Sequence, residues 1–137
     1  MRKLWASMII GMAMSIDGKE LTSFSEISTA LAKGNCIRMV IQIDRCDIDH
    51  CPPSFIHTEA HAVMLRPTYL QFANTSLTTN YPGFEKIPVL ENVTYRILDD
   101  GEVCITVRLI TLPNYQVNGE NSVNYFLGHS ARVYVDD

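Results

Sequence analysis

Four residues of the types that bind zinc lie close together in the middle of the chain: Cys46, Cys51, His57 and His61. Zinc takes thiolate and imidazole ligands in a tetrahedral arrangement, so the residue types fit a metal site. The spacing, C-x4-C-x5-H-x3-H, is looser than the tight pairs of known zinc motifs. Oxidation to a disulfide, which is usual for cysteines of exported proteins, would also remove both thiolates. We therefore expect a disulfide-closed loop beside a polar strand, with a metal site as the alternative.

The chain has four cysteines, Cys36, Cys46, Cys51 and Cys104, and an even number in an exported protein favours disulfides. Cys46 and Cys51 are close enough in the sequence to close a short loop. Cys36 and Cys104 both fall in predicted strands, and a bridge between them would join these strands if they are neighbours. Pairing of Cys46 with Cys104 is the other possibility, so the connectivity stays open.

Other motifs of catalysis are missing from the sequence. It lacks the G-x-S-x-G of a nucleophile elbow, the C-x-x-C of a redox site and a glycine-rich phosphate loop. Asp99 and Asp100 form a carboxylate pair, but with Gly101 behind them they have the composition of a turn. We therefore expect a non-enzymatic protein with no catalytic residue and no bound cofactor.

The first fifteen residues predict that the protein is exported, and the expectation of disulfides depends on this export. Arg2 and Lys3 precede an uncharged, almost wholly apolar run from Leu4 to Met14, and Ala13-Met14-Ser15 places small residues where a signal peptidase needs them. The run is shorter than the roughly 20 residues of a membrane-spanning helix. We expect residues 1–15 to be a cleaved signal peptide and residues 16–137 to be a single globular domain, periplasmic or secreted, with no integral membrane segment after cleavage.

The charge of the chain argues against two kinds of partner. The net charge is −4 at pH 7, and loss of Arg2 and Lys3 with the signal peptide would make it more negative. Nucleic acids and anionic lipids are recognised by clusters of lysine and arginine. We therefore expect neither a nucleic acid nor an anionic membrane surface as the partner.

The elements that must position these residues begin with one short helix. Ser23-Phe24-Ser25-Glu26 has the pattern of a capping box, in which Ser23 accepts from the amide of Glu26 and Glu26 accepts from the amide of Ser23. Apolar residues follow at helical spacing, and Gly34 is a typical helix stop. The sequence predicts a helix from about Phe24 to Lys33.

Strands follow the helix. Residues 37–43 alternate between apolar and polar side chains, which is typical of a half-buried strand. Residues 93–112 form the clearest hairpin, since alignment of the apolar positions on one face leaves a three-residue loop, Asp99-Asp100-Gly101, with Gly101 left-handed. This register places Cys104 on the face away from the core. Residues 117–121 are predicted to be a polar loop.

One helix and six or seven strands without βαβ alternation indicate a mainly β (α+β) fold. We expect an antiparallel meander or a small barrel-like sheet, with the short helix packed on it.

Several segments resemble the VirK family of small exported bacterial proteins. They are residues 20–26, 40–46, 95–103 and 112–116, which read ELTSFSE, VIQIDRC, YRILDDGEV and LPNYQ. The resemblance implies a periplasmic or secreted location and an association with virulence, but no defined activity. Cys46 matches a cysteine of the family pattern, whereas the second cysteine of that pattern, expected near Tyr125-Phe126-Leu127, is absent here.

Two functions remain open beside the metal site. The first is an interaction module that binds a protein partner through an exposed sheet face or loop. The second is a carrier that holds a small apolar ligand inside a barrel lined by aromatic residues. An interior cavity above about 300 Å³ would favour the carrier, whereas a filled interior and an exposed apolar patch would favour the module.

Overall fold

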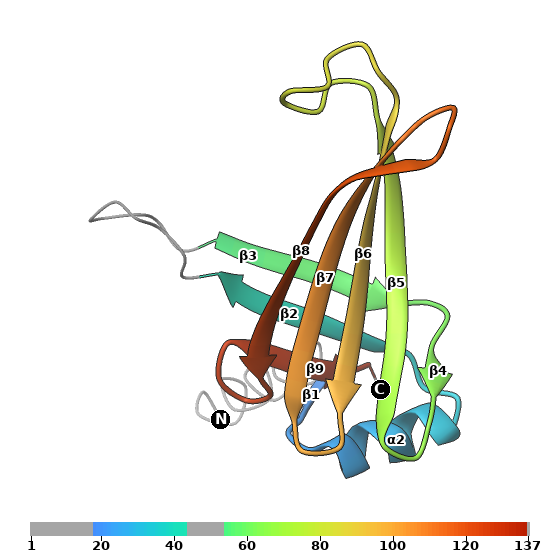
Figure 1. Ribbon diagram of the computed structural model, residues 1–137. Helices are drawn as coiled ribbons and strands as arrows, with labels where there is room; N and C mark the ends of the chain where they lie inside the picture. Colours follow the sequence, from blue (N-terminus) through green and yellow to red (C-terminus); the bar gives the residue numbers. More distant parts are fainter. Residues whose placement is uncertain (1–17, 44–53, 137) are drawn as a thin grey trace, which may run out of the picture.

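The computed structural model describes residues 18–43 and 54–136, which form two antiparallel sheets and one short helix (Figure 1). The predicted signal peptide, Cys46 and Cys51 lie outside the described residues. No helix among the described residues is long and apolar enough to cross a membrane. The elements are β1 (Lys19–Leu21), α2 (Phe24–Ala32), β2 (Ile37–Ile43), β3 (Ser54–Ala60), β4 (Met64–Leu65), β5 (Tyr69–Thr78), β6 (Val89–Leu98), β7 (Glu102–Thr111), β8 (Gln116–Phe126) and β9 (Ala131–Val135).

The helix α2 forms where the sequence predicts it. The Ser23 hydroxyl caps the helix by accepting from the amide of Glu26 at 3.2 Å. The reciprocal bond differs from the prediction, because the Glu26 carboxylate accepts from the amide of Thr22 at 2.9 Å rather than from that of Ser23. Gly34 ends the helix with a φ of 85°, a left-handed conformation that glycine adopts without steric cost.

The four-stranded sheet has the order β1-β9-β2-β3. The predicted strand at residues 37–43 is confirmed as β2, and its Ile37, Met39 and Ile41 are buried in alternation. The C-terminal strand β9 pairs with both β1 and β2, so that Val133 lies opposite Met39. The end of the chain thus closes this sheet.

The five-stranded sheet is a meander of order β4-β5-β6-β7-β8. The predicted hairpin is confirmed as β6 and β7, with Ile97 opposite Val103 and the turn at residues 99–101. Gly101 has a φ of 90°, and the amide of Glu102 donates to the Asp100 carboxylate at 2.9 Å. The meander part of the predicted fold is therefore confirmed.

The barrel-like alternative is not confirmed, because the described strands form two separate sheets rather than one closed sheet. The core lies between these sheets, where β2 and β9 contribute Met39 and Val133 while β5 and β6 contribute Leu70 and Ile97. The sheets stay separate because β9 is paired on both sides within the first sheet, and the β8 edge pairs only with β7 among the described strands.

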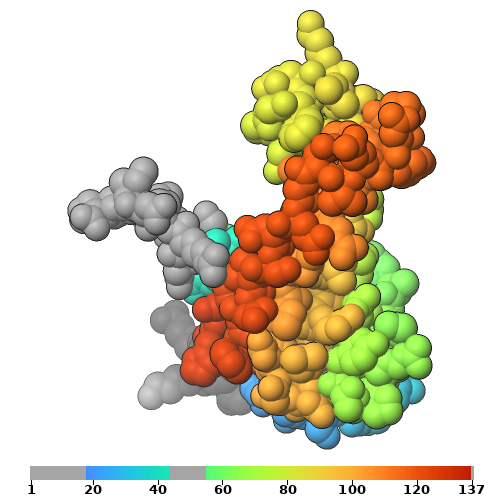
Figure 2. All heavy atoms as spheres, viewed as in Figure 1, coloured from blue at the N-terminus to red at the C-terminus, as the bar shows by residue number. Residues whose placement is uncertain are grey.

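The long strands of the meander extend beyond the core. Tyr95, Ile97 and Ile105 are buried near one end, whereas the expected inward residues Val107 and Leu109 are only half-buried. Figure 1 shows β5–β8 continuing past β2 and β3. In Figure 2 residues 79–88, coloured yellow, and the orange turn between β7 and β8 stand out from the body of the protein. We call this part, residues 74–93 and 107–121, the far end of the sheet.

Candidate functional site

The predicted metal site is not formed by the described residues. His57 on β3 and His61 after it are both exposed, and His61 Nε2 lies 3.7 Å from the Glu59 carboxylate. No group of three His, Cys, Asp or Glu residues within residues 18–43 and 54–136 could hold a metal ion. Cys46 and Cys51 lie outside this part of the chain, so their place in a metal site or a disulfide stays a prediction.

The predicted bridge between Cys36 and Cys104 is not formed, because both are free thiols. The alternative pairing of Cys104 with Cys46 involves a residue outside the described part of the chain and stays a prediction. Cys36 is exposed just before β2 in the four-stranded sheet. Cys104 lies on β7, opposite Arg96, on the face of the five-stranded sheet that points away from the core. The core therefore lies between the two thiols. The position of Cys104 away from the core, which the hairpin register predicts, is confirmed.

The described strands form two separate sheets and no barrel whose interior could serve the predicted carrier function. Phe72 and Tyr95, two of the aromatic residues expected to line it, stack on one another in the core with centroids 4.9 Å apart. A hollow of about 510 Å³ lies instead at the surface, between α2 and the turn after β4, where Phe24 and Leu65 line it. None of the aromatic residues of the strands lines this hollow.

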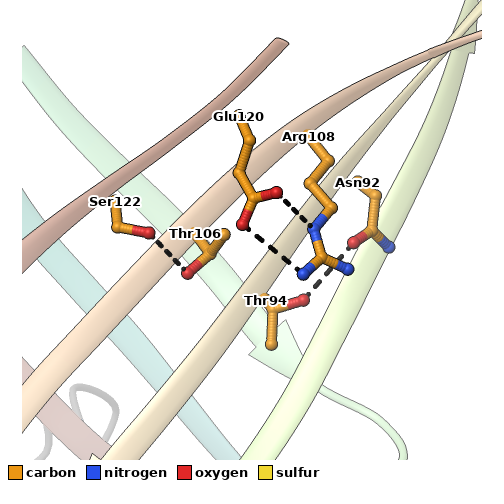
Figure 3. Close-up of polar contacts among 6 residues, drawn as sticks. All are labelled: Asn92, Thr94, Thr106, Arg108, Glu120 and Ser122. Carbon is orange, nitrogen blue, oxygen red and sulfur yellow. Dashed lines mark hydrogen bonds and ion pairs between the residues drawn. The ribbon is translucent and has the colours of Figure 1, made fainter. Parts of the chain in front are cut away.

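The outer face of the five-stranded sheet, which points away from the core, carries ordered rows of polar side chains. Directly opposed residues of β7 and β8 share this face and contact each other: the hydroxyls of Thr106 and Ser122 are 3.0 Å apart, and Arg108 Nε lies 3.4 Å from the Glu120 carboxylate (Figure 3). On β6 the Thr94 hydroxyl donates to Asn92 at 3.3 Å. These contacts order the polar side chains of three neighbouring strands on this face.

An apolar row crosses the same face at the far end. Its members are opposed across four strands: Leu77 on β5, Leu90 on β6, Ile110 on β7 and Val117 on β8. Leu77 is 62% exposed and Val117 53% exposed, while the two central residues are half-buried. We call Leu77, Leu90, Ile110 and Val117 the apolar row. Tyr115, two residues before Val117, is also hydrophobic and is 70% exposed.

A hollow of about 370 Å³ lies in the polar part of this face, and Arg96, Cys104 and Arg108 are among the residues that line it. The Arg96 guanidinium lies 4.6 Å from the centre of the Tyr69 ring and donates from Nε and Nη2 to the Gln71 side-chain oxygen, at 3.0 and 2.7 Å. We call it the Arg96 hollow.

The Cys104 thiol is a poor nucleophile in this setting. Burial raises its pKa, the Glu102 carboxylate raises it further, and the Arg96 charge lowers it in part. A thiol with a raised pKa is mostly protonated at neutral pH, and the thiolate is the reactive form.

With this geometry in place, comparison with known proteins gives the family. The family model described as VirK protein matches residues 20–115. The chain belongs to the VirK family. The match runs from β1 to the turn after β7, and so includes the strands that carry most of the outer face.

A solved VirK family protein from Legionella pneumophila has the same fold. Its crystal structure superposes with a TM-score of 0.72 and 21% identity, over 84% of this chain and 98% of that one. A search of curated proteins gave no match.

The outer face was not singled out by the sequence of this VirK family member. The alternation of polar residues on β6 is visible in Asn92, Thr94 and Arg96, and is a usual mark of a solvent-facing sheet surface. The apolar row has no such signal, because its members come from four strands and meet only through the register.

Proposed function

We propose that this VirK family protein is exported to the periplasm or the medium and acts there as a non-enzymatic, virulence-associated interaction module. The outer face of its five-stranded sheet binds a partner protein. The single observation that carries the proposal is the apolar row, exposed at the far end where no other described element covers it.

The apolar row supports partner binding because its side chains are contiguous. Exposed hydrophobic residues scattered singly need no explanation, but a continuous apolar strip rimmed by polar residues is typical of an interaction site. Full burial of a leucine or valine side chain contributes about 1.5–3 kcal/mol. Covering the exposed parts of Leu77 and Val117, 62% and 53% of each residue, would contribute roughly half of that apiece.

The interaction module is favoured over the apolar-ligand carrier by the packing of the interior. The core side chains of both sheets pack against each other, and the fully buried Met39, Leu70 and Ile97 line neither of the two hollows described above. An apolar ligand would need a cavity among these residues.

The non-enzymatic part of the proposal is supported by the state of Cys104, the thiol described on the outer face. Cys104 is held as a neutral thiol by burial and by Glu102, so it is not activated as a catalytic nucleophile would be.

The export part of the proposal is supported by residues 1–15 and by the family. Intact mass spectrometry of the protein recovered from the envelope and from the medium tests it, with and without alkylation. A mass that corresponds to removal of residues 1–15 is the expected result. A full-length mass in both fractions would contradict export by this route.

Site-specific photo-cross-linking tests the docking surface. A photoreactive side chain replaces Leu77 in one variant and Phe55 on β3 in another, a matched control since the two residues are 62% and 60% exposed. The variant at Leu77 should give one discrete adduct in the compartment where the protein is found, and the variant at Phe55 should not. Equal adducts at both positions, or none at Leu77, would contradict the proposed docking surface.

A further inference from the structure

The Arg96 hollow is a positively charged feature on an acidic chain. The chain has a net charge of −4, yet the charged residues that line the hollow are Arg96 and Arg108. A local cationic site on a protein of opposite net charge indicates electrostatic complementarity to an acidic group.

The two arginines differ in how their charge is used. Arg108 is neutralised by Glu120, with which it forms an ion pair at 3.4 Å. Arg96 has no carboxylate within ion-pair distance in the part of the chain that the structure describes, where its partners are the neutral Gln71 and Tyr69. Arg96 is therefore the charge available to a partner.

The Arg96 guanidinium is also held in place. Stacking on Tyr69 fixes its plane, and two of its N–H groups donate to the single oxygen of Gln71. A guanidinium has five N–H donors, so three are left without a partner among the described residues. A planar fork of donors matches a carboxylate, which it can bind through two parallel hydrogen bonds.

The distance to the apolar row sets a second requirement on the partner. Arg96 and Leu90 lie on the same face of β6, six residues apart. At about 3.3 Å per residue they are roughly 20 Å apart along the strand. A protein that contacts both must present a carboxylate and an apolar side chain at that separation.

We infer that Arg96 binds an aspartate or glutamate carboxylate of the partner protein, while the apolar row binds an apolar side chain about 20 Å away. This inference rests on the proposed function and names the chemistry of the partner. Thr94 and Thr106, whose hydroxyls lie between the two contacts on β6 and β7, accept hydrogen bonds from the intervening segment, since a hydroxyl oxygen that donates to a neighbour keeps acceptor capacity.

The test combines the photoreactive residue at position 77 with a second substitution in the full chain. Arg96→Gln removes the charge, and Arg132→Gln is the matched control, since Arg132 is an exposed strand arginine of the other sheet. Arg96→Gln should lower the adduct yield at sub-saturating expression about tenfold or more. Arg132→Gln should leave it unchanged, and Arg96→Lys should restore it only in part, because lysine lacks the planar fork.

The outcomes separate this inference from the proposed function. An adduct at position 77 that is unchanged by Arg96→Gln overturns the carboxylate contact and leaves the docking surface standing. No adduct at position 77 overturns both.

A direct titration tests the chemistry of the site. Sodium glutarate and sodium phosphate are added to the full protein at equal ionic strength, and the guanidinium Nη–H signals of Arg96, which include the donors not used by Gln71, are followed by NMR. A shift that is larger with glutarate is expected. Equal shifts would show a general anion site and would overturn the commitment to a carboxylate.

Discussion

Two leucines on one strand provide a sharp test of where the core ends. Leu70 and Leu77 both lie on β5, seven residues apart. Leu70 is fully buried between the sheets, whereas Leu77 is 62% exposed in the apolar row. Each is replaced by alanine in the same background, so the chemical change is identical and only the surroundings differ.

The expected costs differ severalfold. Leu70→Ala removes a side chain that is 0% exposed and leaves a cavity, which costs about 2.7–5 kcal/mol of unfolding free energy. Leu77→Ala removes mainly solvent-exposed surface, and the weaker strand preference of alanine adds a part of the roughly 1 kcal/mol range of that scale. We expect Leu77→Ala to cost under about 1 kcal/mol.

Urea unfolding, followed by circular dichroism, measures both values. With a slope of about 2 kcal/mol per molar urea, Leu70→Ala should lower the midpoint by roughly 1.5–2.5 M and Leu77→Ala by less than about 0.5 M. The two midpoints would fall together if the far end were packed like the core. That result would refute the exposure of the apolar row and, with it, the basis of the proposed docking surface.

Three further predictions follow from single positions. Gly101→Ala should lower the unfolding free energy by about 1–2 kcal/mol, because the φ of Gly101 is 90°. Gly119→Ala, at a position without positive φ, should cost clearly less. Equal losses of unfolding free energy for the two variants in urea would contradict the argument from φ. Cys104 should react with iodoacetamide at pH 7.5 more slowly than the exposed Cys36, because its pKa is raised; peptide mapping would show equal rates if the argument fails. Burial raises the pKa of Tyr95, so its stabilising effect should be complete below about pH 10 and be lost as the pH rises through the folded-state pKa; Tyr95→Phe should flatten this loss.

The local elements of the fold could be predicted because their signals are local. The cap at Ser23 and the stop at Gly34 bound α2 within one residue of the expected end. The β6–β7 hairpin follows from the need to keep the apolar positions on one face, which permits only one turn length.

The errors come from contacts between distant segments. Residues 117–121, polar enough to be predicted as a loop, form part of β8 because β7 offers an open edge to which they hydrogen-bond. Cys104 lies in a strand as expected, whereas Cys36 lies just before β2, and β2 and β7 are in different sheets. Strand sequences do not specify their neighbours, so the disulfide could not be judged from spacing.

The candidate site shows the same division. The hairpin register already placed Cys104 on the face away from the core, and the structure shows that Arg96 shares this face. The hydrogen bonds from Arg96 to the Gln71 side chain depend on the pairing of β5 with β6. The apolar row depends on the register of four strands at once.

The sequence by itself determined the helix, the hairpin and the side-chain alternation, because caps, turns and periodicity act over a few residues. Only the tertiary structure decided that the strands divide into two sheets and that the strands of the five-stranded sheet extend beyond the four-stranded sheet. The physical reason is that strand pairing and burial are satisfied between residues far apart in the chain, where many arrangements fit the same alternation. The exposed apolar row at the far end of the sheet, and the partner chemistry inferred for it, follow from that arrangement.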